Sequence, residues 1–192
     1  FTTHALDTEV DFFTVVDDLA AVEETGAAHT NDMELGAGIF YGYVVVDVPL
    51  LVSNLTGCRR EAWRDQDHEA ARALLELLIQ AITQVSPGAK LGATAPYARA
   101  ECVVLEAGDA QPRSLANAFL HPVRLDPDRG HPMALSVQAL AGYLDALEAM
   151  YGDSGERRYV ASIHGWSRDR QPVVSLPQAT RSVLDDLFRS RS

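Results

Sequence analysis

Two β-rich runs decide the fold of this chain: Val10-Asp11-Phe12-Phe13-Thr14-Val15-Val16 and Gly38-Ile39-Phe40-Tyr41-Gly42-Tyr43-Val44-Val45-Val46. β-branched and aromatic residues of this kind are enriched in strands. We therefore predict a strand or strand-like arm over residues 10–16, and the clearest strand of the chain over residues 38–48, ending at Pro49. The polar segment 17–37 between them is predicted to hold a short helical turn around residues 18–24 and a loop.

The rest of the chain alternates between apolar helical patterns and short β-rich runs. The clearest helix is predicted over residues 66–86, where apolar residues recur at helical spacing and Pro87-Gly88 ends the pattern. Other predicted elements are strands at 1–6, 101–107 and 158–164, helices at 50–55 (closed by Gly57), at 115–120 (capped by Ser114) and from Ser136 onward, and a terminal helix opened by Ser175 and Pro177. Strands and helices do not alternate strictly, so we expect an α+β fold, an antiparallel sheet with helices on one face.

The composition bounds the class of protein. The chain has 192 residues, of which 47% are hydrophobic, and no apolar run reaches the length of a membrane span. No secretory signal is visible, and the chain begins with Phe1 rather than Met, which is compatible with a fragment of a longer protein. Cys58 and Cys102 form neither a CxxC pair nor a zinc-ligand cluster, so a reducing cytoplasm is expected.

The charge balance is acidic. A formal net charge of -11 argues, taken alone, against a nucleic-acid binder, which usually carries a basic face. Lys90 is the only lysine, and arginines supply the other cations. The local clusters Arg59-Arg60 and Arg157-Arg158 are interpreted as parts of a solvated surface.

No motif for catalysis, phosphate binding or metal binding stands out. Asp7, Asp11 and Asp17-Asp18 could form a carboxylate cluster for metal-dependent phosphodiester cleavage, but helix capping or a solvated turn is the favoured interpretation. The six histidines are scattered, and no Gly-x-Ser-x-Gly sequence is present. Gly36-Ala37-Gly38 precedes a strand rather than a helix, which is the wrong context for a phosphate loop. We expect no catalytic residue, no metal and no cofactor.

The remaining candidate site is Phe12-Phe13-Thr14, with Val16 close by. Bases of single-stranded nucleic acid stack on aromatic side chains, which contributes about 1–3 kcal/mol per base. Adjacent residues of an extended arm point to opposite faces, so one phenylalanine could anchor the arm while the other wedges against a base. The alternative, that both phenylalanines are core residues of a strand, is favoured on composition alone.

Several blocks of the sequence carry a resemblance to a known family. They are Thr2-Thr3-His4, residues 10–19, Gly38-Ile39-Phe40-Tyr41 with Tyr43, Pro87-Gly88-Ala89-Lys90 and Ser114-Leu115-Ala116-Asn117-Ala118-Phe119. In this order they resemble the C-terminal part of the CasC family, the repeated backbone subunit of the type I-E CRISPR surveillance complex, Cascade. The resemblance runs to about residue 150 and fades after it. One departure is Tyr41-Gly42-Tyr43, where the family usually has Tyr-Arg-Tyr.

The resemblance implies the shape of a right hand. The palm would be an RNA-recognition-like, ferredoxin-like antiparallel sheet with helices on one face, the fingers would be helical, and the thumb would be an extended β-hairpin. Residues 1–37 would hold a strand and the thumb hairpin, and residues 38–192 the C-terminal part of the palm domain. The family's first half, with the opening palm strand and most of the phosphate-gripping basic residues, has no counterpart in these residues. The resemblance therefore also implies an incomplete palm with exposed sheet edges.

The resemblance further implies a function and partners. Copies of the subunit would polymerise along the guide RNA (crRNA), and each thumb would displace one base at a regular interval. Phe12, Phe13, Thr14 and Val16 would contact RNA from the thumb, and Lys90 would contact phosphate. The partners would be crRNA, target DNA through the guide duplex, copies of the chain itself in a helical backbone and other Cascade subunits, with no membrane involved. The chain would be a non-catalytic scaffold of antiviral defence in which base pairing reads sequence.

Two other functions stay open at this point. Related backbone subunits of another CRISPR type carry a catalytic aspartate near the thumb, so a metal-dependent RNA endonuclease would use Asp11, Asp17 or Asp18. A protein-interaction domain would instead place Phe12 and Phe13 in a subunit interface.

Overall fold

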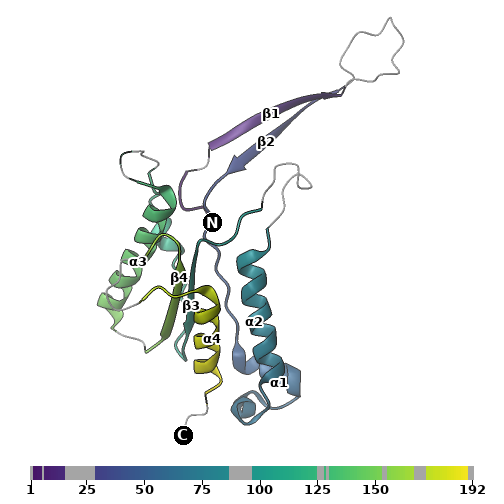
Figure 1. The fold of residues 1–192 in the computed structure, drawn as a ribbon, viewed down its shortest axis with the longest axis vertical. Coiled ribbons are helices and arrows are strands. Elements are labelled where there is room, and N and C mark those ends of the chain that lie inside the picture. The colour runs from purple at the N-terminus through teal and green to yellow at the C-terminus, as the bar shows by residue number, and fades with distance from the viewer. Residues whose placement is uncertain are drawn as a thin grey trace, which may run out of the picture.

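A body of helices around a short sheet carries a long β-hairpin that projects from one end (Figure 1). This computed structural model describes residues 2–5, 7–15, 29–86, 97–124, 128, 130–152, 155–166 and 172–189. Its elements are β1 (Asp7–Val15), β2 (His29–Ala37), α1 (Val48–Thr56), the 3₁₀ helix η1 (Arg60–Asp65), α2 (Glu69–Gln84), β3 (Cys102–Ala107), the 3₁₀ helix η3 (Ala116–Phe119), α3 (Pro132–Tyr151), β4 (Arg157–Ser162) and α4 (Leu176–Leu187).

The projecting hairpin consists of β1 and β2. The two strands are antiparallel, and their register runs from Asp7 opposite Ala37 to Val15 opposite His29. The strand predicted over residues 10–16 is confirmed as far as Val15, whereas Val16 and the helical turn expected around 18–24 lie outside the described residues. The loop expected up to residue 37 is wrong, because β2 occupies residues 29–37. A hairpin that projects from the body is not required to bury one face of its strands. β2 therefore lacks the alternation of apolar and polar residues from which a strand is predicted.

The body is built around a second antiparallel pair, β3 and β4, in which Val104 lies opposite Val160 and Leu105 opposite Tyr159. Figure 1 shows α3 on one side of this pair and α4 and α2 on the other. Leu105 packs against the first hydrophobic cluster and Val104 against the second, as the alternation of strand side chains requires. The α+β class is confirmed, but the expectation of helices on one face only is wrong.

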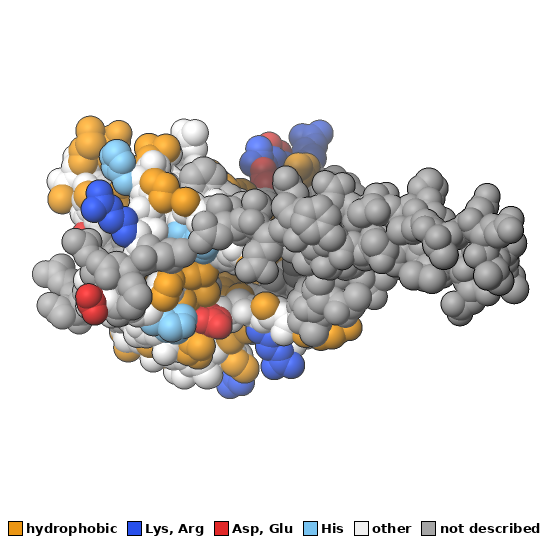
Figure 2. All heavy atoms as spheres, turned by 90° about the horizontal axis from the view of Figure 1, so that it is seen from above, with side chains coloured by type: hydrophobic (Ala, Val, Ile, Leu, Met, Phe, Trp, Pro, Cys, Tyr) orange, Lys and Arg blue, Asp and Glu red, His pale blue; other side chains and the backbone are white. Residues whose placement is uncertain are grey.

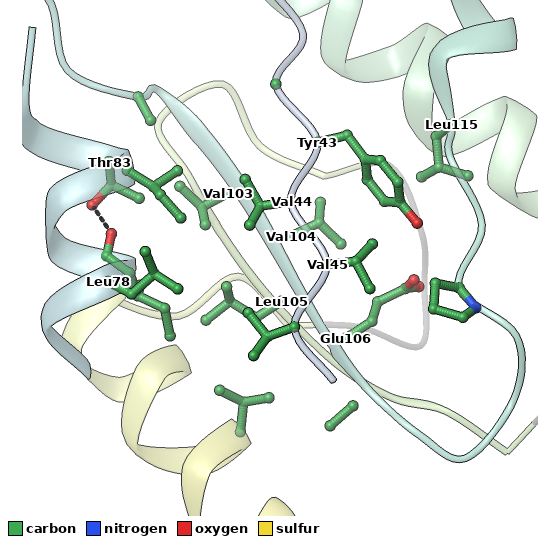
Figure 3. A pocket seen from close by; sticks show the side chains of 18 of the residues that line it. Tyr43, Val44, Val45, Leu78, Thr83, Val103, Val104, Leu105, Glu106 and Leu115 are labelled. Atoms are coloured by element: carbon green, nitrogen blue, oxygen red, sulfur yellow. Dashed lines mark hydrogen bonds between the residues drawn. The ribbon is translucent and has the colours of Figure 1, made fainter. Parts of the chain in front are cut away.

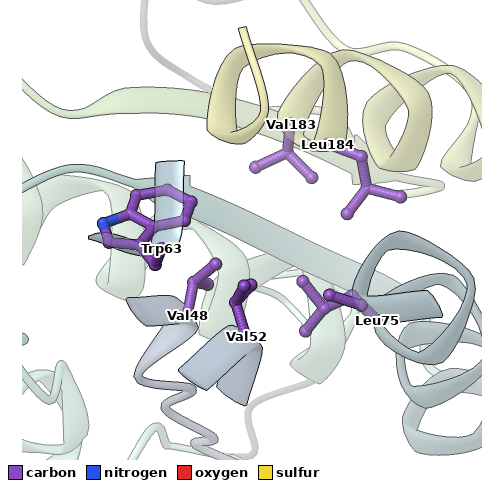
Figure 4. Close-up of a cluster of buried hydrophobic side chains, with 7 residues drawn as sticks. Val48, Val52, Trp63, Leu75, Val183 and Leu184 are labelled. Carbon is purple, nitrogen blue, oxygen red and sulfur yellow. The ribbon is translucent and has the colours of Figure 1, made fainter. Parts of the chain in front are cut away.

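The first hydrophobic cluster joins α1, η1, α2 and α4 to the Leu105 face of β3 and β4 (Figure 4). Its buried members are Val48, Val52, Trp63, Ala71, Leu75, Val183 and Leu184. Leu184 and Val52 are almost fully buried. Trp63 packs against Phe188 in a T-shaped arrangement with ring centroids 6.5 Å apart. Burial of such side chains stabilises a fold by about 1.5–3 kcal/mol each, so this cluster holds the helical side of the body together.

The second cluster joins α3 and η3 to the other face of the sheet. Leu115, Phe119, Leu140 and Leu144 are its buried residues, and Leu144 has no exposed surface. Tyr41, from the segment that leads out of the hairpin, packs on Phe119 with ring centroids 5.8 Å apart. The Tyr41 hydroxyl also accepts a hydrogen bond from the Leu115 N–H at 3.0 Å. The Tyr41 side chain therefore fixes the segment after β2 to this side of the body.

Ion pairs link β3, β4 and α3 on the same side of the sheet. The Arg158 guanidinium, with only 5% of its side chain exposed, lies 2.5 Å from a Glu106 oxygen and 2.9 Å from a Glu148 oxygen. Arg113 reaches Glu156 at 2.5 Å and Glu106 at 3.4 Å. A Cβ at Gly108 would stand 2.7 Å from the Glu156 Cγ, so the chain passes this network too closely for a larger residue.

Several helix ends confirm the predicted caps. The Ser175 hydroxyl accepts the Gln178 N–H at 3.3 Å and Pro177 occupies the first turn of α4, as expected. Gly57 closes α1 with a φ of 72°, and its N–H donates to the Ser53 carbonyl at 2.8 Å. The chosen start of the second long helix is wrong, because α3 begins at Pro132 and Ser136 lies buried in its second turn.

Two predicted strands are not strands. The clearest strand was expected over residues 38–48, but among the described residues this segment pairs only through one isolated bridge between Phe40 and Thr2, and Val48 begins α1. The expected strand over residues 1–6 is reduced to the same bridge. The β-branched run after Tyr41 keeps its strand-forming composition but makes no backbone hydrogen bond to another residue that the structure describes. A high strand propensity does not form a sheet without a partner strand.

The strand expected at 101–107 is confirmed as β3, in which Glu106 is exposed and the other residues are partly buried. Within the part of the chain that the structure describes, none of the helices is long and apolar enough to cross a membrane.

Candidate nucleic-acid interface

The β-hairpin is the candidate interface because it carries three of the five residues expected to bind RNA. Phe12, Phe13 and Thr14 lie in β1, where their backbones pair with Asp32, Asn31 and Thr30 of β2. Val16 and Lys90, the other two, lie outside the described residues. The structure thus puts three of these residues consecutively on one strand of an arm that extends away from the body (Figure 1).

The base of this arm is tied to the body by hydrogen bonds on both sides of Thr3. The Thr3 N–H donates to the Ile39 carbonyl, and the Thr3 carbonyl accepts from the Val123 N–H, each at 2.9 Å. The buried hydroxyls of Thr3 and Ser136 are hydrogen-bonded at 2.9 Å, and Ser136 belongs to α3. Thr3 therefore connects the hairpin base to α3 and to the loop before it.

His4 supports the other strand of the hairpin base. Its Nδ1 lies 2.6 Å from the Ala5 carbonyl, which can only accept, so Nδ1 carries the proton. Its Nε2 is then free to accept the Ile39 N–H at 3.1 Å. The ring is 8% exposed, so both of its nitrogens are satisfied inside the protein.

Sequence reasoning did not identify these anchoring residues. In the sequence, Thr3 and His4 stand out only as part of a family block, and Ser136 only as the predicted start of a helix. One available signal was a Thr-Thr-His run of polar residues next to a predicted strand, since buried polar side chains are nearly always hydrogen-bonded.

Most of the arginines that the structure describes have acidic partners. Of the clusters noted in the sequence, Arg60 pairs with Asp47 at 2.7 Å, Arg157 with Asp186 at 3.0 Å, and Arg158 is held by two glutamates. Figure 2, which views the molecule from the end that bears the hairpin, shows basic side chains scattered rather than gathered in one patch. The solvated-surface interpretation is confirmed for Arg59, Arg60 and Arg157, which are exposed, and is wrong for Arg158, whose side chain is 5% exposed.

Arg124 is a cation whose neighbour in sequence is hydrogen-bonded to the hairpin base. It follows Val123, whose N–H bonds to Thr3, and its side chain is exposed. No motif of the sequence singles it out, and no ion pair joins it to another residue that the structure describes. It is therefore an exposed cation beside the hairpin base that sequence reasoning missed.

Two histidines are stacked near the start of α3. The rings of His131 and His164 lie 5.1 Å apart at an interplanar angle of 16°. His164 Nε2 lies 2.6 Å from a Glu101 carboxylate oxygen, and His131 Nδ1 accepts the Met133 N–H and so caps α3. Both rings have structural partners, which accounts for them without a ligand.

The described residues include no group of three or more His, Cys, Asp or Glu side chains that could hold a metal ion. Asp11 lies in β1, opposite Met33, while Asp17 and Asp18 lie outside the described residues.

Burial raises the pKa of the Cys102 thiol, and a hydrogen bond from Ser162 lowers it in part. A thiol with a raised pKa is a poor nucleophile at neutral pH.

Comparisons with known proteins match nearly the whole chain. A family model described as CT1975-like protein matches residues 1–189. The match continues well past residue 150, where the sequence resemblance was expected to fade, so that expectation is wrong. The comparison with curated proteins found no match.

Two solved structures have a similar fold. One is described as a CRISPR RNA-guided surveillance complex, with 27% sequence identity and a TM-score of 0.79, and the match covers 98% of this chain and 68% of that chain. The other is described as a CRISPR RNA-guided surveillance complex, pre-nicking, with 26% identity and a TM-score of 0.79. That match covers 97% of this chain and 53% of the solved chain, so this chain spans about half of its length.

Proposed function

Because this chain belongs to the CT1975-like family of Cas proteins, we propose that it is a non-catalytic, guide-RNA-binding subunit of a CRISPR surveillance complex. The observation that carries the proposal is the agreement of fold with two such complexes over at least 97% of the chain. In finer form, the chain is part of the repeated backbone subunit of a type I-E Cascade. Its partners are then crRNA, further copies of itself and other Cascade subunits, with target DNA bound through the guide.

The hairpin of β1 and β2 is the thumb in this proposal. Residues 1–37 form the arm and its base, and residues 38–192 belong to the palm. A two-stranded ribbon anchored at one end can reach over an RNA strand that another subunit holds. Its length supports this, since β1 has nine residues and a strand rises by about 3.3 Å per residue.

Phe12, Phe13, Thr14 and Val16 act as the wedge at the displaced base. Aromatic side chains stack on any base, because every base has a flat π face. Such contacts hold an unstacked nucleotide without reading its identity, which leaves the guide sequence to base pairing. Lys90 and the exposed Arg124 contribute phosphate contacts.

The double substitution Phe12→Ala and Phe13→Ala in the full-length protein tests the wedge. We expect weaker assembly on crRNA, by roughly 1–3 kcal/mol for each stacked base lost, with the RNA length unchanged. A native gel shift with labelled crRNA measures the affinity. The RNA length is measured on a denaturing gel after the protein and the RNA have been incubated with Mg²⁺.

The matched control is Leu77→Ala, which truncates an exposed apolar residue on α2, away from the arm. It should bind crRNA as the wild type does. Wild-type affinity in the double variant would refute the wedge, and Mg²⁺-dependent shortening of the RNA would refute the non-catalytic role.

A further inference from the structure

Three titratable side chains meet at the start of α3, and the proposed RNA contacts do not include them. His131 precedes Pro132, the first residue of α3, and its ring is stacked on that of His164, with centroids 5.1 Å apart. His164 Nε2 lies 2.6 Å from a carboxylate oxygen of Glu101. Glu101 precedes β3 and His164 follows β4, so this histidine cluster of His131, His164 and Glu101 joins the ends of both strands to α3.

The hydrogen bonds of the cluster define where its protons lie at neutral pH. His131 Nδ1 accepts the Met133 N–H at 3.3 Å, and a backbone N–H can only donate, so Nδ1 carries no proton. An ionised Glu101 carboxylate can only accept, so His164 Nε2 carries a proton. A further proton on His164 would keep the pair with Glu101. A further proton on His131 would occupy Nδ1 and remove the cap of α3.

The charges around the cluster oppose the protonation of both rings. Two stacked imidazolium rings would face one carboxylate, that of Glu101, and the N-terminus of α3 adds a partial positive charge of its own. The first turn of α3 holds no acidic residue, and no ion pair joins His131 to another residue that the structure describes. Asp128, which precedes the helix, is exposed and has contacts of its own. The folded cluster therefore accommodates one added proton but not two.

Protons from the solvent can reach the cluster. An open groove runs beside β3, and Figure 3 shows the part of it that Val44 and Val45 line together with Val104. Glu101 and His131 line the same groove, and His131 is exposed. The protonation of His131 can therefore follow the pH of the solvent without prior unfolding of the chain.

The first turn of α3 also holds the base of the hairpin. The Ser136 hydroxyl lies 2.9 Å from the Pro132 carbonyl and 2.9 Å from the Thr3 hydroxyl, so one side chain connects the start of the helix to the hairpin base. Loss of the His131 cap would leave the Met133 N–H without an acceptor and loosen this turn. A change of charge at His131 would thereby weaken the support of Thr3.

We propose that the histidine cluster makes the attachment of the hairpin sensitive to pH. At neutral pH the uncharged His131 caps α3, and the first turn of the helix holds Thr3. Histidine changes charge at about pH 5 to 8, and as the pH falls through this range the second proton enters the cluster at His131 and removes the cap. The unfolded chain takes up this proton without such a penalty, so it binds more protons than the folded chain, and stability falls as the pH falls.

His131→Asn in the full-length protein tests the proposal. Asparagine is a good N-cap, so this variant keeps a capping side chain but loses the titratable one. Between about pH 7.5 and about pH 5.5, the Tm of the wild type should fall by ~3 °C more than that of the variant. The remaining histidines are the same in both proteins, so their titration does not enter the difference. Equal pH dependence in the two proteins would overturn the proposal.

His164→Gln tests whether the two rings act as a pair. This substitution removes the neighbouring charge, so a proton on His131 meets less repulsion and the fall in Tm with pH should become smaller. A pH dependence as large as that of the wild type would show that His164 has no part in the effect and would overturn the proposed role of the cluster.

Hydrogen exchange of the wild-type protein gives a measurement that does not depend on a variant folding. Protection factors correct for the intrinsic effect of pH on exchange, and those of the Met133 and Thr3 amides should fall by roughly tenfold at the lower pH. The Ala179 amide is the internal control, because it donates to the Ser175 carbonyl in α4 and should keep its protection. Unchanged protection at Thr3, or an equal loss at Ala179, would overturn the proposal.

Discussion

At the scale of single residues, Arg158 connects two strands and one helix of the body through ion pairs. Arg158 joins β4 to Glu106 of β3 and to Glu148 of α3, and its side chain is 5% exposed. An arginine so deeply placed is stabilising only while both carboxylates remain opposite it, because the loss of one partner leaves buried charge uncompensated. Exposed pairs such as Arg60 with Asp47 contribute much less.

Arg158→Met should therefore lower the free energy of unfolding by about 2–3 kcal/mol. The effect is smaller than for a fully buried ion pair because the two glutamates are partly exposed. The control, Arg60→Met, should cost less than about 1 kcal/mol. Urea denaturation followed by circular dichroism measures both. Equal effects of the two substitutions would mean that the Arg158 network is not coupled to folding.

At the scale of elements, local signals were sufficient where the element depends on its own sequence. The caps at Gly57 and Ser175 and the helix over residues 69–84 followed from local hydrogen-bonding chemistry and apolar spacing. Elements that depend on distant partners were not predictable. β2 is polar and pairs only because β1 lies beside it, and residues 38–47 are apolar but lack a partner among the described residues.

The candidate site divides in the same way. Phe12, Phe13 and Thr14 could be located on a strand from composition, and they lie on β1. The contacts of Thr3 with Ser136 and of His4 with Ile39 join residues 133 and 35 positions apart, and no local pattern encodes such distances. The start of α3 was misplaced for a related reason, since a serine fits a cap as well as a buried contact to Thr3.

The hairpin base supplies a prediction at this scale. Ser136→Ala leaves the buried Thr3 hydroxyl without its partner, which should cost about 1–3 kcal/mol and speed exchange at the Thr3 and Val123 amides. Adding Thr3→Val should recover much of the loss, because both polar groups are then removed.

Hydrogen exchange with mass spectrometry measures the amides, and thermal denaturation measures the stability. Ser114→Ala is the control, since the Ser114 hydroxyl is exposed and accepts only the nearby Ala116 N–H at 3.2 Å. Unchanged exchange at Thr3 in Ser136→Ala would show that this contact does not anchor the arm.

At the scale of the whole molecule, the charge balance limits what the described part can bind. The net charge is -11, and many described arginines are paired with carboxylates of the same chain. These are Arg60, Arg64, Arg72, Arg113, Arg157, Arg158 and Arg189. Few cations are left to displace counterions from a phosphate backbone, so electrostatic affinity for RNA must come from elsewhere.

We accordingly expect the 192-residue chain to bind single-stranded RNA weakly and with little dependence on salt, whereas the full-length protein should bind tightly and lose affinity steeply as salt rises. Fluorescence anisotropy across a salt series measures both. Tight, salt-sensitive binding by the 192-residue chain would contradict this expectation.

The anchored hairpin converts a small rotation at its base into a larger displacement of its tip. With nine residues in β1, the arm is about 30 Å long, so a rotation of ~10° about Thr3 would sweep its tip through ~5 Å, about the spacing of two neighbouring strands. The hydrogen bonds of Thr3 and His4 at the base oppose such a rotation of the arm. If the arm is the proposed thumb, the accuracy with which its tip meets the RNA is set at the opposite end of the arm, by Thr3 and His4.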